Sequence, residues 1–493
     1  MTKLFFIVSF IFTLPLQIAS VRYNYSYYGD VVHSAPGMTY AAYFNAQTLG
    51  TKLSAPEDFV IYEDMIYMVD AVENKVVTIN SDFTYNDEFA SFELTQSYID
   101  ELASEGATEF PALTLKAPSG IDVKPSGIYV ADTGNYRIVK LNHNFEVIDV
   151  FSDMEDPTFD EILFEPRKIT VDATERMYVV AKNVYEGIME IDNDGSFNRF
   201  TGVNPVSLTP IEIFRRSLMS EAQLAKIRLY LPTEYTSVEI NDKSFIYATS
   251  KPSSDNTNAE NTIQLINPKG LDVMKRNGYH PPMGDVHFMI GSNNYVVTGP
   301  SLLVDIASTE NGIYTVLDQK RSRLFTYDSE GNLLYINGDE GSQSDKFAKG
   351  VAIGYLGDDL IVLDGEARTF IVYRLTDFGR AVNQAIAYHT QGKYDQAAQV
   401  WEEVVLLNTN YEIAYNGIGK FMLREGRFKE AMEYFALGHD QYYYSKAFKS
   451  YRNTVIKENF GYIMLVVVLL GGTGIFLKIK KTYRKGGSIL YED

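Results

Sequence analysis

The sequence predicts a mainly β fold, a six-bladed β-propeller, followed by a small α-helical module and one transmembrane helix. Short apolar strands separated by polar turns recur over roughly residues 50 to 375. Beyond Phe378 the apolar spacing changes from that of strands to that of helices, and residues 461–477 form an uncharged apolar run. Because a single blade cannot bury both of its faces alone, repeated blades imply a closed ring.

The composition excludes several classes of protein. The chain of 493 residues has a formal net charge of −20, whereas a nucleic-acid-binding protein needs a basic surface, so no nucleic acid partner is expected. It contains no cysteine, which excludes disulfides, thiolate metal ligands and cysteine nucleophiles. Its 36 tyrosines suit a β-rich fold, although tyrosine-rich surfaces also stack on sugars.

Residues 1–20 have the layout of a signal peptide. A lysine at position 3 precedes an apolar run from Leu4 to Leu16, and the small residues Ala19 and Ser20 follow. This order of charged, apolar and small residues is typical of a secretory leader. An uncleaved membrane anchor is the alternative.

The segment between the leader and the first repeat contains two features. Residues 21–36 are tyrosine-rich and polar, and we expect a loosely ordered lead-in that carries Asn24-Tyr25-Ser26, a match to a glycosylation acceptor. The apolar stretch from Met38 to Phe44 predicts an isolated strand. We expect it to complete the last blade, since a strand added there removes exposed edges from the ring.

The best-preserved repeat is Ala117–Leu141, with the sequence APSGIDVKPSGIYVADTGNYRIVKL. Its turn residues separate three predicted strands. The motif Ala131–Asn135 followed by Arg137-Ile138 resembles the NHL repeat, a family of β-propellers. The resemblance implies a fold more firmly than an activity, because propellers serve as binding modules, scaffolds, lactonases and lyases.

Six central strands predict six blades within residues 21–377. These strands are Ile66–Asp70, Ile128–Ala131, Met177–Ala181, Ile246–Ser250, Ile313–Asp318 and Leu360–Asp364. Between the third and the fourth blade, a capping threonine followed by proline and helical apolar spacing predicts an inserted helix at about 209–228.

Two helical repeats are predicted in residues 378–457. Three features recur 34 residues apart: Gly392-Lys393-Tyr394 as Gly426-Arg427-Phe428, Ala397 as Ala431, and Trp401 as Phe435. This pattern resembles tetratricopeptide (TPR) repeats, in which small alanines let paired helices approach and aromatic side chains fill the gaps. A further helix from about 441 to 457 is expected to cap the module.

The sequence predicts a single transmembrane helix over residues 460–479. The run Gly461–Leu477 carries no charge, and with its flanks it spans about 26–30 Å as a helix, enough to cross the hydrocarbon core. Lysines and an arginine follow at once. By the positive-inside rule, the short tail 480–493 is cytoplasmic and the large N-terminal domain is extracytoplasmic, in a single-pass cell-membrane protein.

Two sets of loop residues are candidates for function at the mouth of the propeller channel. The loops that lead into each blade contribute binding candidates Glu57, Asp58, Ser119, Arg167, Lys168 and Lys349. The ends of the central strands contribute Asp70, Asp132, Asp318 and Asp364. We interpret these aspartates as turn formers that accept backbone N–H bonds, with Arg137, Arg323 and Arg368 as their partners.

No catalytic residue, metal or cofactor is predicted. In gluconolactonase-type propellers, the metal ligands lie at the positions where this chain has Ala55 and Ser119, so the expected ligands are missing. NHL-type lyases use a cluster of histidines, and no histidine of this chain lies in a loop that leads into a blade. No Gly-x-Ser-x-Gly elbow or paired-histidine spacing occurs. The segment Asp192–Gly195 predicts a hairpin turn rather than a calcium loop.

The sequence therefore predicts a membrane-anchored extracytoplasmic binding or scaffold protein. It would recognise a glycan or a partner protein through the propeller face and the TPR-like module, as an accessory to a transport or envelope complex. The alternative is a divergent metal-dependent lactonase- or lyase-like enzyme, with Glu57 and Asp122 near a metal in the channel. A third reading is a receptor that signals through a partner helix. The identity of the ligand is not predicted.

Overall fold

The computed structural model describes residues 22–104, 106, 110–152, 163–203, 219, 233–252, 261–286 and 299–486. The chain divides into two compact units, Met1–Ile386 and Ala387–Asp493. The leader expected at 1–20 lies outside the described residues, as does the inserted helix expected at about 209–228, apart from Met219. The end of the tail, 487–493, lies outside them as well.

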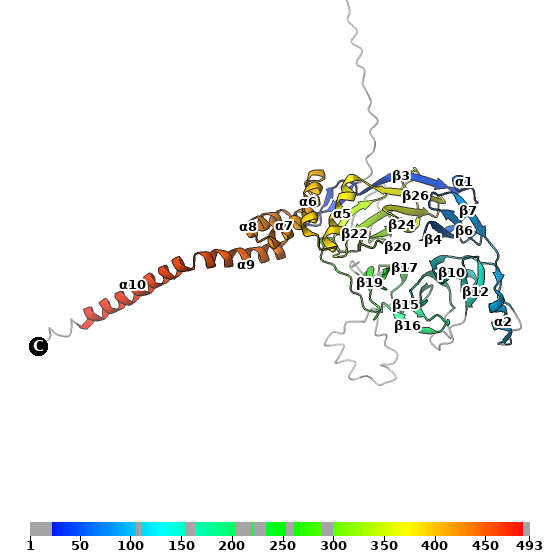
Figure 1. The fold of residues 1–493 in the computed structure, drawn as a ribbon, viewed down its shortest axis with the longest axis horizontal. Helices are drawn as coiled ribbons and strands as arrows, with labels where there is room; N and C mark the ends of the chain where they lie inside the picture. Colours follow the sequence, from blue (N-terminus) through cyan, green and yellow to red (C-terminus); the bar gives the residue numbers. More distant parts are fainter. Residues whose placement is uncertain are drawn as a thin grey trace, which may run out of the picture. The chain divides into compact units, whose positions relative to one another are not determined.

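The first unit is a six-bladed β-propeller, as the sequence predicts (Figure 1). Blade one comprises β4 (Pro56–Tyr62), β5 (Met65–Asp70), β6 (Lys75–Asn80) and β7 (Tyr85–Phe89), and blade two comprises β9 (Gly120–Lys124), β10 (Gly127–Asp132), β11 (Arg137–Leu141) and β12 (Glu146–Phe151). Blade three comprises β13 (Pro166–Val171), β14 (Met177–Ala181), β15 (Ile188–Ile191) and β16 (Phe197–Thr201), and blade four comprises β17 (Tyr235–Ile240), β18 (Ile246–Ser250) and β19 (Ile263–Ile266). Blade five comprises β20 (Leu303–Ser308), β21 (Tyr314–Asp318), β22 (Arg323–Tyr327) and β23 (Leu333–Asn337), and blade six comprises β24 (Gly350–Leu356), β25 (Asp359–Asp364), β26 (Thr369–Leu375) and β3 (Met38–Asn45).

The ring also carries two short helices and one strand that the sequence does not predict. Helix α1 (Ala46–Leu49) follows β3, and α2 (Gln96–Ser104) follows β8 (Glu93–Leu94), which pairs with β12 in parallel. The six predicted central strands are all present, as β5, β10, β14, β18, β21 and β25.

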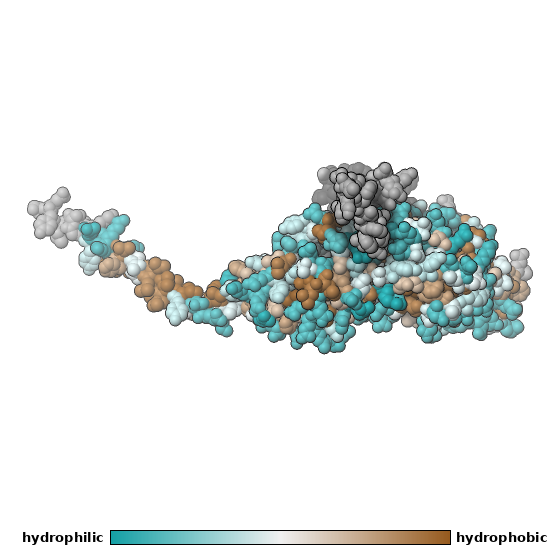
Figure 2. Space-filling model, turned by 90° about the horizontal axis from the view of Figure 1, so that it is seen from above, coloured by the Kyte–Doolittle hydropathy of each residue, from teal (hydrophilic) through white to brown (hydrophobic). Residues whose placement is uncertain are grey.

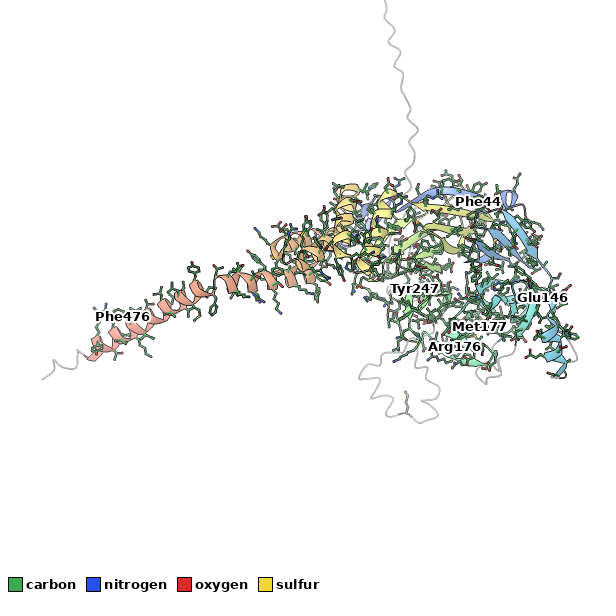
Figure 3. All side chains as sticks on the ribbon, viewed as in Figure 1. Phe44, Glu146, Arg176, Met177, Tyr247 and Phe476 are labelled. Carbon is green, nitrogen blue, oxygen red and sulfur yellow. The ribbon has the colours of Figure 1, made fainter. Side chains whose placement is uncertain are left out.

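The ring is closed by the strand that precedes it. Strand β3 pairs antiparallel with β26, from Thr369 opposite Asn45 to Leu375 opposite Met38. Phe44 lies on β3 (Figure 3). Its ring stacks on that of Phe83 of blade one, with 4.2 Å between ring centroids. The inner strands contact one another in the cyclic order β4, β9, β13, β17, β20, β24 and β4 again. The prediction that Met38–Phe44 completes the last blade is therefore confirmed.

The core of the propeller lies between its blades. Each sheet is buried on both faces, so its central strand is almost wholly apolar: MIYMVD in β5 and MYVVA in β14. In the cluster between blades two and three, Tyr129 and Ala131 pack with Ile169 and Met177. A blade outside the ring would expose both of these surfaces, which explains why the repeat requires closure.

The aspartates that end the central strands hold turns together, as predicted. Asp70 accepts N–H bonds from four backbone groups, at Ser54, Ala55, Val72 and Glu73. These bonds tie the loop that leads into the blade to the turn after the central strand. Asp318 and Asp364 do the same in blades five and six. In blade two, Asp132 accepts from the Lys116 N–H on the entry side and from the Asn135 and Arg137 side chains on the other.

The predicted arginine partners of these aspartates are only partly right. Arg137 donates to Asp132 at 2.7 Å. Arg323 instead pairs with Asp339 at 2.9 Å, because the loop after blade five brings that carboxylate to it. In the described part of the chain, Asp364 bonds to backbone N–H groups and no pair with the predicted Arg368 is formed.

The lead-in expected to be loosely ordered is a docked hairpin. Strands β1 (Tyr23–Tyr25) and β2 (Val31–His33) pair antiparallel. The hydroxyls of Tyr23 and Tyr25 donate to the two oxygens of Asp285, at 2.8 and 2.5 Å. Asn24, in the glycosylation triplet, is 8% exposed and donates its amide to the Leu334 carbonyl. Burial of tyrosine rings against the propeller therefore orders this polar segment.

The second unit is helical. The helices are α5 (Asp377–Thr390), which spans the boundary between the units, α6 (Tyr394–Leu407), α7 (Glu412–Arg424), α8 (Phe428–Leu437), α9 (Gln441–Glu458) and α10 (Phe460–Gly486). Consecutive helices from α6 to α9 pack on one another. Trp401 and Phe435 are buried against Gly417 and Gly419 of α7, where a Cβ would lie 2.3 and 2.8 Å from the rings.

Helix α10 is long and apolar enough to cross a membrane. Within its segment Phe460–Arg484, an 18-residue window has a mean hydropathy of 2.3, and this window is not buried by the rest of the chain. Figure 2 shows the hydrophobic residues along this helix, and Figure 3 shows Phe476 on it. The other described helices do not pass the same criteria of length and hydropathy.

Candidate binding site in the propeller channel

The inner strands of all six blades surround a cavity of about 280 Å³ in the propeller channel. Polar side chains from five blades face it: Asp58, Asp122, Lys168, Thr170, Ser237, Glu239, Asp305 and Ser308. The sixth blade contributes Ile353, Gly354 and Tyr355. The cavity therefore has a mixed lining of carboxylates, hydroxyls and one ammonium group, set in an apolar wall.

A β-bulge that recurs in five of the six blades positions four of these polar side chains. In five blades the pairing of the inner strand with the central strand shifts at the second residue of the inner strand. A bulge re-aims the residue that follows it. In four of these blades the third residue is polar, and these equivalent residues are Asp58, Lys168, Ser237 and Asp305.

These four side chains form one network. The Nζ of Lys168 lies 2.5 Å from Asp58 and 3.6 Å from Asp305, and the Ser237 hydroxyl donates to Asp305 at 2.5 Å. Burial would lower the pKa of Lys168, but Asp305 and Asp58 raise it on balance. Burial raises the pKa of Asp58, although Lys168 opposes that shift. The ammonium thus neutralises a site that would otherwise hold two buried carboxylates.

The acidic side chains also join consecutive blades. The inner edge of each inner strand has backbone N–H groups that its own sheet leaves unpaired, as at any sheet edge. Side-chain oxygens from the preceding blade accept several of them: Asp58 from Ile121, Asp122 from Val171, Thr170 from Ile240, Glu239 from Ser308 and Asp305 from Ile353. These five bonds connect blades one to six in order. The charges in the channel therefore have a structural role.

One oxygen in the channel is not used in this way. Glu239 accepts the Ser308 N–H through Oε1 at 3.2 Å, while its Oε2 is buried and has no hydrogen-bond partner among the described residues. Burial raises the pKa of Glu239 to about 8. Because a buried polar atom without a partner costs about 1–3 kcal/mol, this oxygen is the point of the channel at which a ligand would gain most.

The six predicted binding residues separate into two groups. Asp58 and Lys168 meet in the channel, whereas Glu57 and Arg167 are the bulged residues that precede them. The hydroxyl of Ser119 bonds to Thr133 at 2.5 Å and joins blades two and three through the Arg167 carbonyl. Lys349 is exposed and its backbone N–H bonds to Asp364.

Sequence reasoning missed Ser237, Glu239 and Asp305. They lie on inner strands of blades four and five, where the repeat motif is degenerate. For Ser237 and Asp305 the signal was a polar residue at the third position of an inner strand, the position that Asp58 and Lys168 occupy in blades one and three. Glu239 follows Ser237 by two residues, so it lies on the same side of its strand.

The metal site of the alternative reading would use Asp122 and Glu57. Asp122 already accepts from Val171 at 2.7 Å and from Thr170 at 3.2 Å, and lies 3.2 Å from Lys124. In the described residues no three His, Asp or Glu side chains are grouped so as to hold a metal ion.

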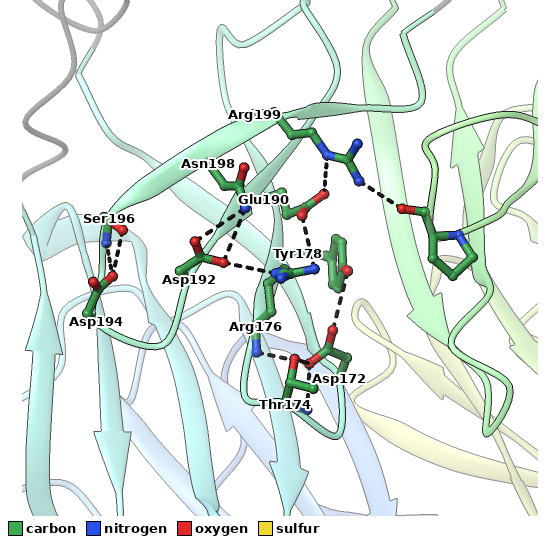
Figure 4. A network of polar contacts seen from close by, with 11 residues as sticks. Asp172, Thr174, Arg176, Tyr178, Glu190, Asp192, Asp194, Ser196, Asn198 and Arg199 are labelled. Carbon is green, nitrogen blue, oxygen red and sulfur yellow. Dashed lines mark hydrogen bonds and ion pairs between the residues drawn. The ribbon is translucent and has the colours of Figure 1, made fainter.

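A second polar network lies on blade three, outside the channel lining (Figure 4). Glu190 pairs with Arg176 at 3.2 Å and with Arg199 at 2.9 Å. Asp192 accepts from Gly195 in the turn between β15 and β16, as the predicted hairpin turn requires. Each acid in this network has local donors, which indicates a structural role.

Replacing Glu239 with glutamine should make the stability of the protein less dependent on pH. A carboxyl whose folded pKa is raised binds its proton more tightly when folded, so it stabilises the fold below about pH 4.5 and loses this contribution as the pH rises to about 8. At pH 8.5 the variant should be more stable by an amount on the order of 3 kcal/mol. Chemical denaturation of the full chain in detergent at pH 5 and pH 8.5 measures this, and equal pH slopes would contradict it.

Comparisons with protein-family models and with curated protein sequences find no match. Similar solved structures include virginiamycin B lyase from Staphylococcus aureus in a catalytically inactive form with quinupristin, at 13% identity over 65% of this chain and 80% of that one, TM-score 0.37. They also include a streptogramin B lyase, at 15% identity over 70% and 100% of the two chains, TM-score 0.38. A third is PorZ, a surface component of the type IX secretion system of Porphyromonas gingivalis, at 9% identity over 66% and 38%, TM-score 0.35. At these identities the chain is similar to the lyase propellers in fold alone.

Proposed function

We propose that this chain is a membrane-anchored binding protein whose propeller channel takes a small polyhydroxylated ligand, such as one sugar unit of a glycan. The observation that carries the proposal is Glu239, which lines the cavity and whose Oε2 is buried without a hydrogen-bond partner among the described residues. A hydroxyl group satisfies such an oxygen whether the carboxyl is ionised or protonated, because it can both donate and accept.

The rest of the lining supports a ligand of the same chemistry. Lys168 supplies a donor, Asp58 and Asp305 supply acceptors, and Ser308 and Tyr355 supply hydroxyls. Specific sites for small molecules combine an apolar wall with a few placed polar groups of this kind. The volume of about 280 Å³ suits one sugar unit rather than a folded partner.

The helical module supports a second part of the proposal, a scaffold role. Ala397 and Ala431 are buried one repeat apart, and so are Trp401 and Phe435. This 34-residue equivalence supports a pair of TPR-like repeats, and the blade pattern supports an NHL-like propeller. With α10 as a single span, the propeller would be displayed outside the cell and the tail would lie in the cytoplasm.

Glycan binding to the full-length protein in detergent tests the proposal. A monosaccharide panel followed by a glycan array should identify a ligand, and Glu239→Gln should weaken its binding at least tenfold, about 1.4 kcal/mol. Glu310→Gln is the matched control, since Glu310 is exposed on the blade-five hairpin. Equal losses in the two variants would contradict a channel site.

The enzyme alternative gives a different result in the same preparation. A metal assay that finds one divalent ion per chain, lost in Asp122→Asn, would favour a metal-dependent propeller enzyme over the binding protein.

A further inference from the structure

Helix α9 presents an exposed aromatic and apolar stripe. Tyr444, Phe448, Tyr451 and Val455 are 37–46% exposed and are spaced four, three and four residues apart. Residues at this spacing share one face of a helix. The neighbouring face packs on α8 through the fully buried Ala447, so the stripe is a separate surface.

The stripe continues from α9 into the candidate membrane span. Continuing the alternating steps of four and three leads through Glu458 to Tyr462, Leu465, Leu469, Gly472 and Phe476 of α10. The two helices are nearly continuous, because Asn459 N–H bonds to Val455 and its carbonyl accepts from Ile463. A repeat of 3.5 residues sustained over this length is the pattern of a coiled-coil seam.

The charges of α9 lie away from this stripe. In the heptad whose a and d positions are the stripe, Lys446, Lys449 and Lys457 occupy the outer positions f, b and c. Of the positions that flank the seam, only the one held by Arg452 carries a charge in α9. A second basic helix can therefore approach the stripe without strong repulsion.

We propose that the stripe joins two copies of this chain in a parallel α9–α10 dimer. Because the stripe runs through α9 into α10, a soluble partner could cover it only as far as Glu458, whereas a partner that also crosses the membrane could cover all of it. A second copy meets this condition in register, since its α10 crosses the same bilayer in the same direction. The proposal rests on the membrane-anchoring part of the proposed function, but not on ligand binding.

The single charged residue of the seam explains how the dimer would keep its register. Glu458 lies between the α9 and α10 parts of the stripe. A polar or charged residue at one seam position lowers the stability of a coiled coil while disfavouring other alignments. Replacing it should therefore strengthen the association.

Cysteine cross-linking of the full chain tests the dimer, because the protein has no cysteine of its own. Tyr451→Cys and Val455→Cys place thiols in the seam, and Asn453→Cys is the matched control on the opposite face. In phosphatidylcholine vesicles under mild oxidation, the seam variants should form at least about five times more disulfide-linked dimer than the control. Equal cross-linking at all three positions, or none at any, would overturn the proposal.

Two further variants separate the dimer from other outcomes. Glu458→Leu should raise the cross-linked fraction of Val455→Cys, and Phe448→Lys should lower it at least about fivefold. Lys449→Glu should leave it unchanged, and a loss in that variant would show that charges outside the seam, rather than the stripe, decide the association. Resistance to carbonate extraction separately checks the membrane anchor, so a monomeric but inserted protein would count against the dimer alone.

Discussion

Replacing Lys168 with methionine should lower the free energy of unfolding by about 3–5 kcal/mol, because it leaves uncompensated carboxylates in a buried site. The Lys168 side chain is 12% exposed and that of Asp58 is 8% exposed, with 2.5 Å between their charged atoms. Methionine keeps most of the aliphatic volume, so the change isolates the loss of the charge. Chemical denaturation of the full chain at pH 7.5 measures it.

The double variant Lys168→Met with Asp58→Asn is the control for the charge. It removes one buried acid together with the base, so it should recover at least half of the loss. Lowering the pH should also reduce the defect of the single variant, since both acids can then be protonated. A double variant that is less stable than Lys168→Met would show that packing, not charge, decides the effect.

Replacing Phe44 with alanine should destabilise the propeller by about 3 kcal/mol and loosen its closure. Phe44 lies on β3 and stacks on Phe83, and both pack on the core between blades six and one. Its neighbour Tyr43 is more exposed and lies on the opposite face of the strand, so Tyr43→Ala should cost much less. Thermal unfolding of the two variants measures the difference.

Hydrogen exchange gives a readout that is specific to closure. In Phe44→Ala the amides of β26 should lose protection before those of β10, because β26 pairs with β3 while β10 lies inside blade two. Uniform loss of protection over the whole ring would contradict the view that Phe44 acts at the seam.

Much of the fold was predictable because the blades repeat their turn chemistry. Each central strand is a short apolar run that ends near a polar turn, and in four blades an aspartate ends the strand and accepts backbone N–H bonds. The helical spacing of apolar residues and the apolar run of α10 predicted the helices equally clearly. The docked hairpin β1–β2 was not predictable, because its stability depends on Asp285, some 260 residues away, which bonds to both tyrosines.

The site was less predictable than the fold. Asp58 and Lys168 were recognised by their place before a strand, but their pairing follows from the bulges that turn both side chains into the channel. In the sequence, nothing distinguishes Glu239 from any other acidic residue in a strand. Only the closure of the ring places it on the cavity wall. Proximity in the sequence pairs Arg323 with Asp318, whereas the loop after blade five brings Asp339 to it at 2.9 Å.

The closure of the ring by β3 has a consequence for how the nascent chain matures. Strand β3 is made more than 300 residues before β26, the strand with which it pairs. Throughout that interval the backbone N–H and C=O groups of β3 that pair with β26 have no partner strand. Contacts between such distant segments also form slowly. The earliest strand of the ring is therefore the last to gain its partner, and its open edge is a surface for self-association until residue 375 has been made.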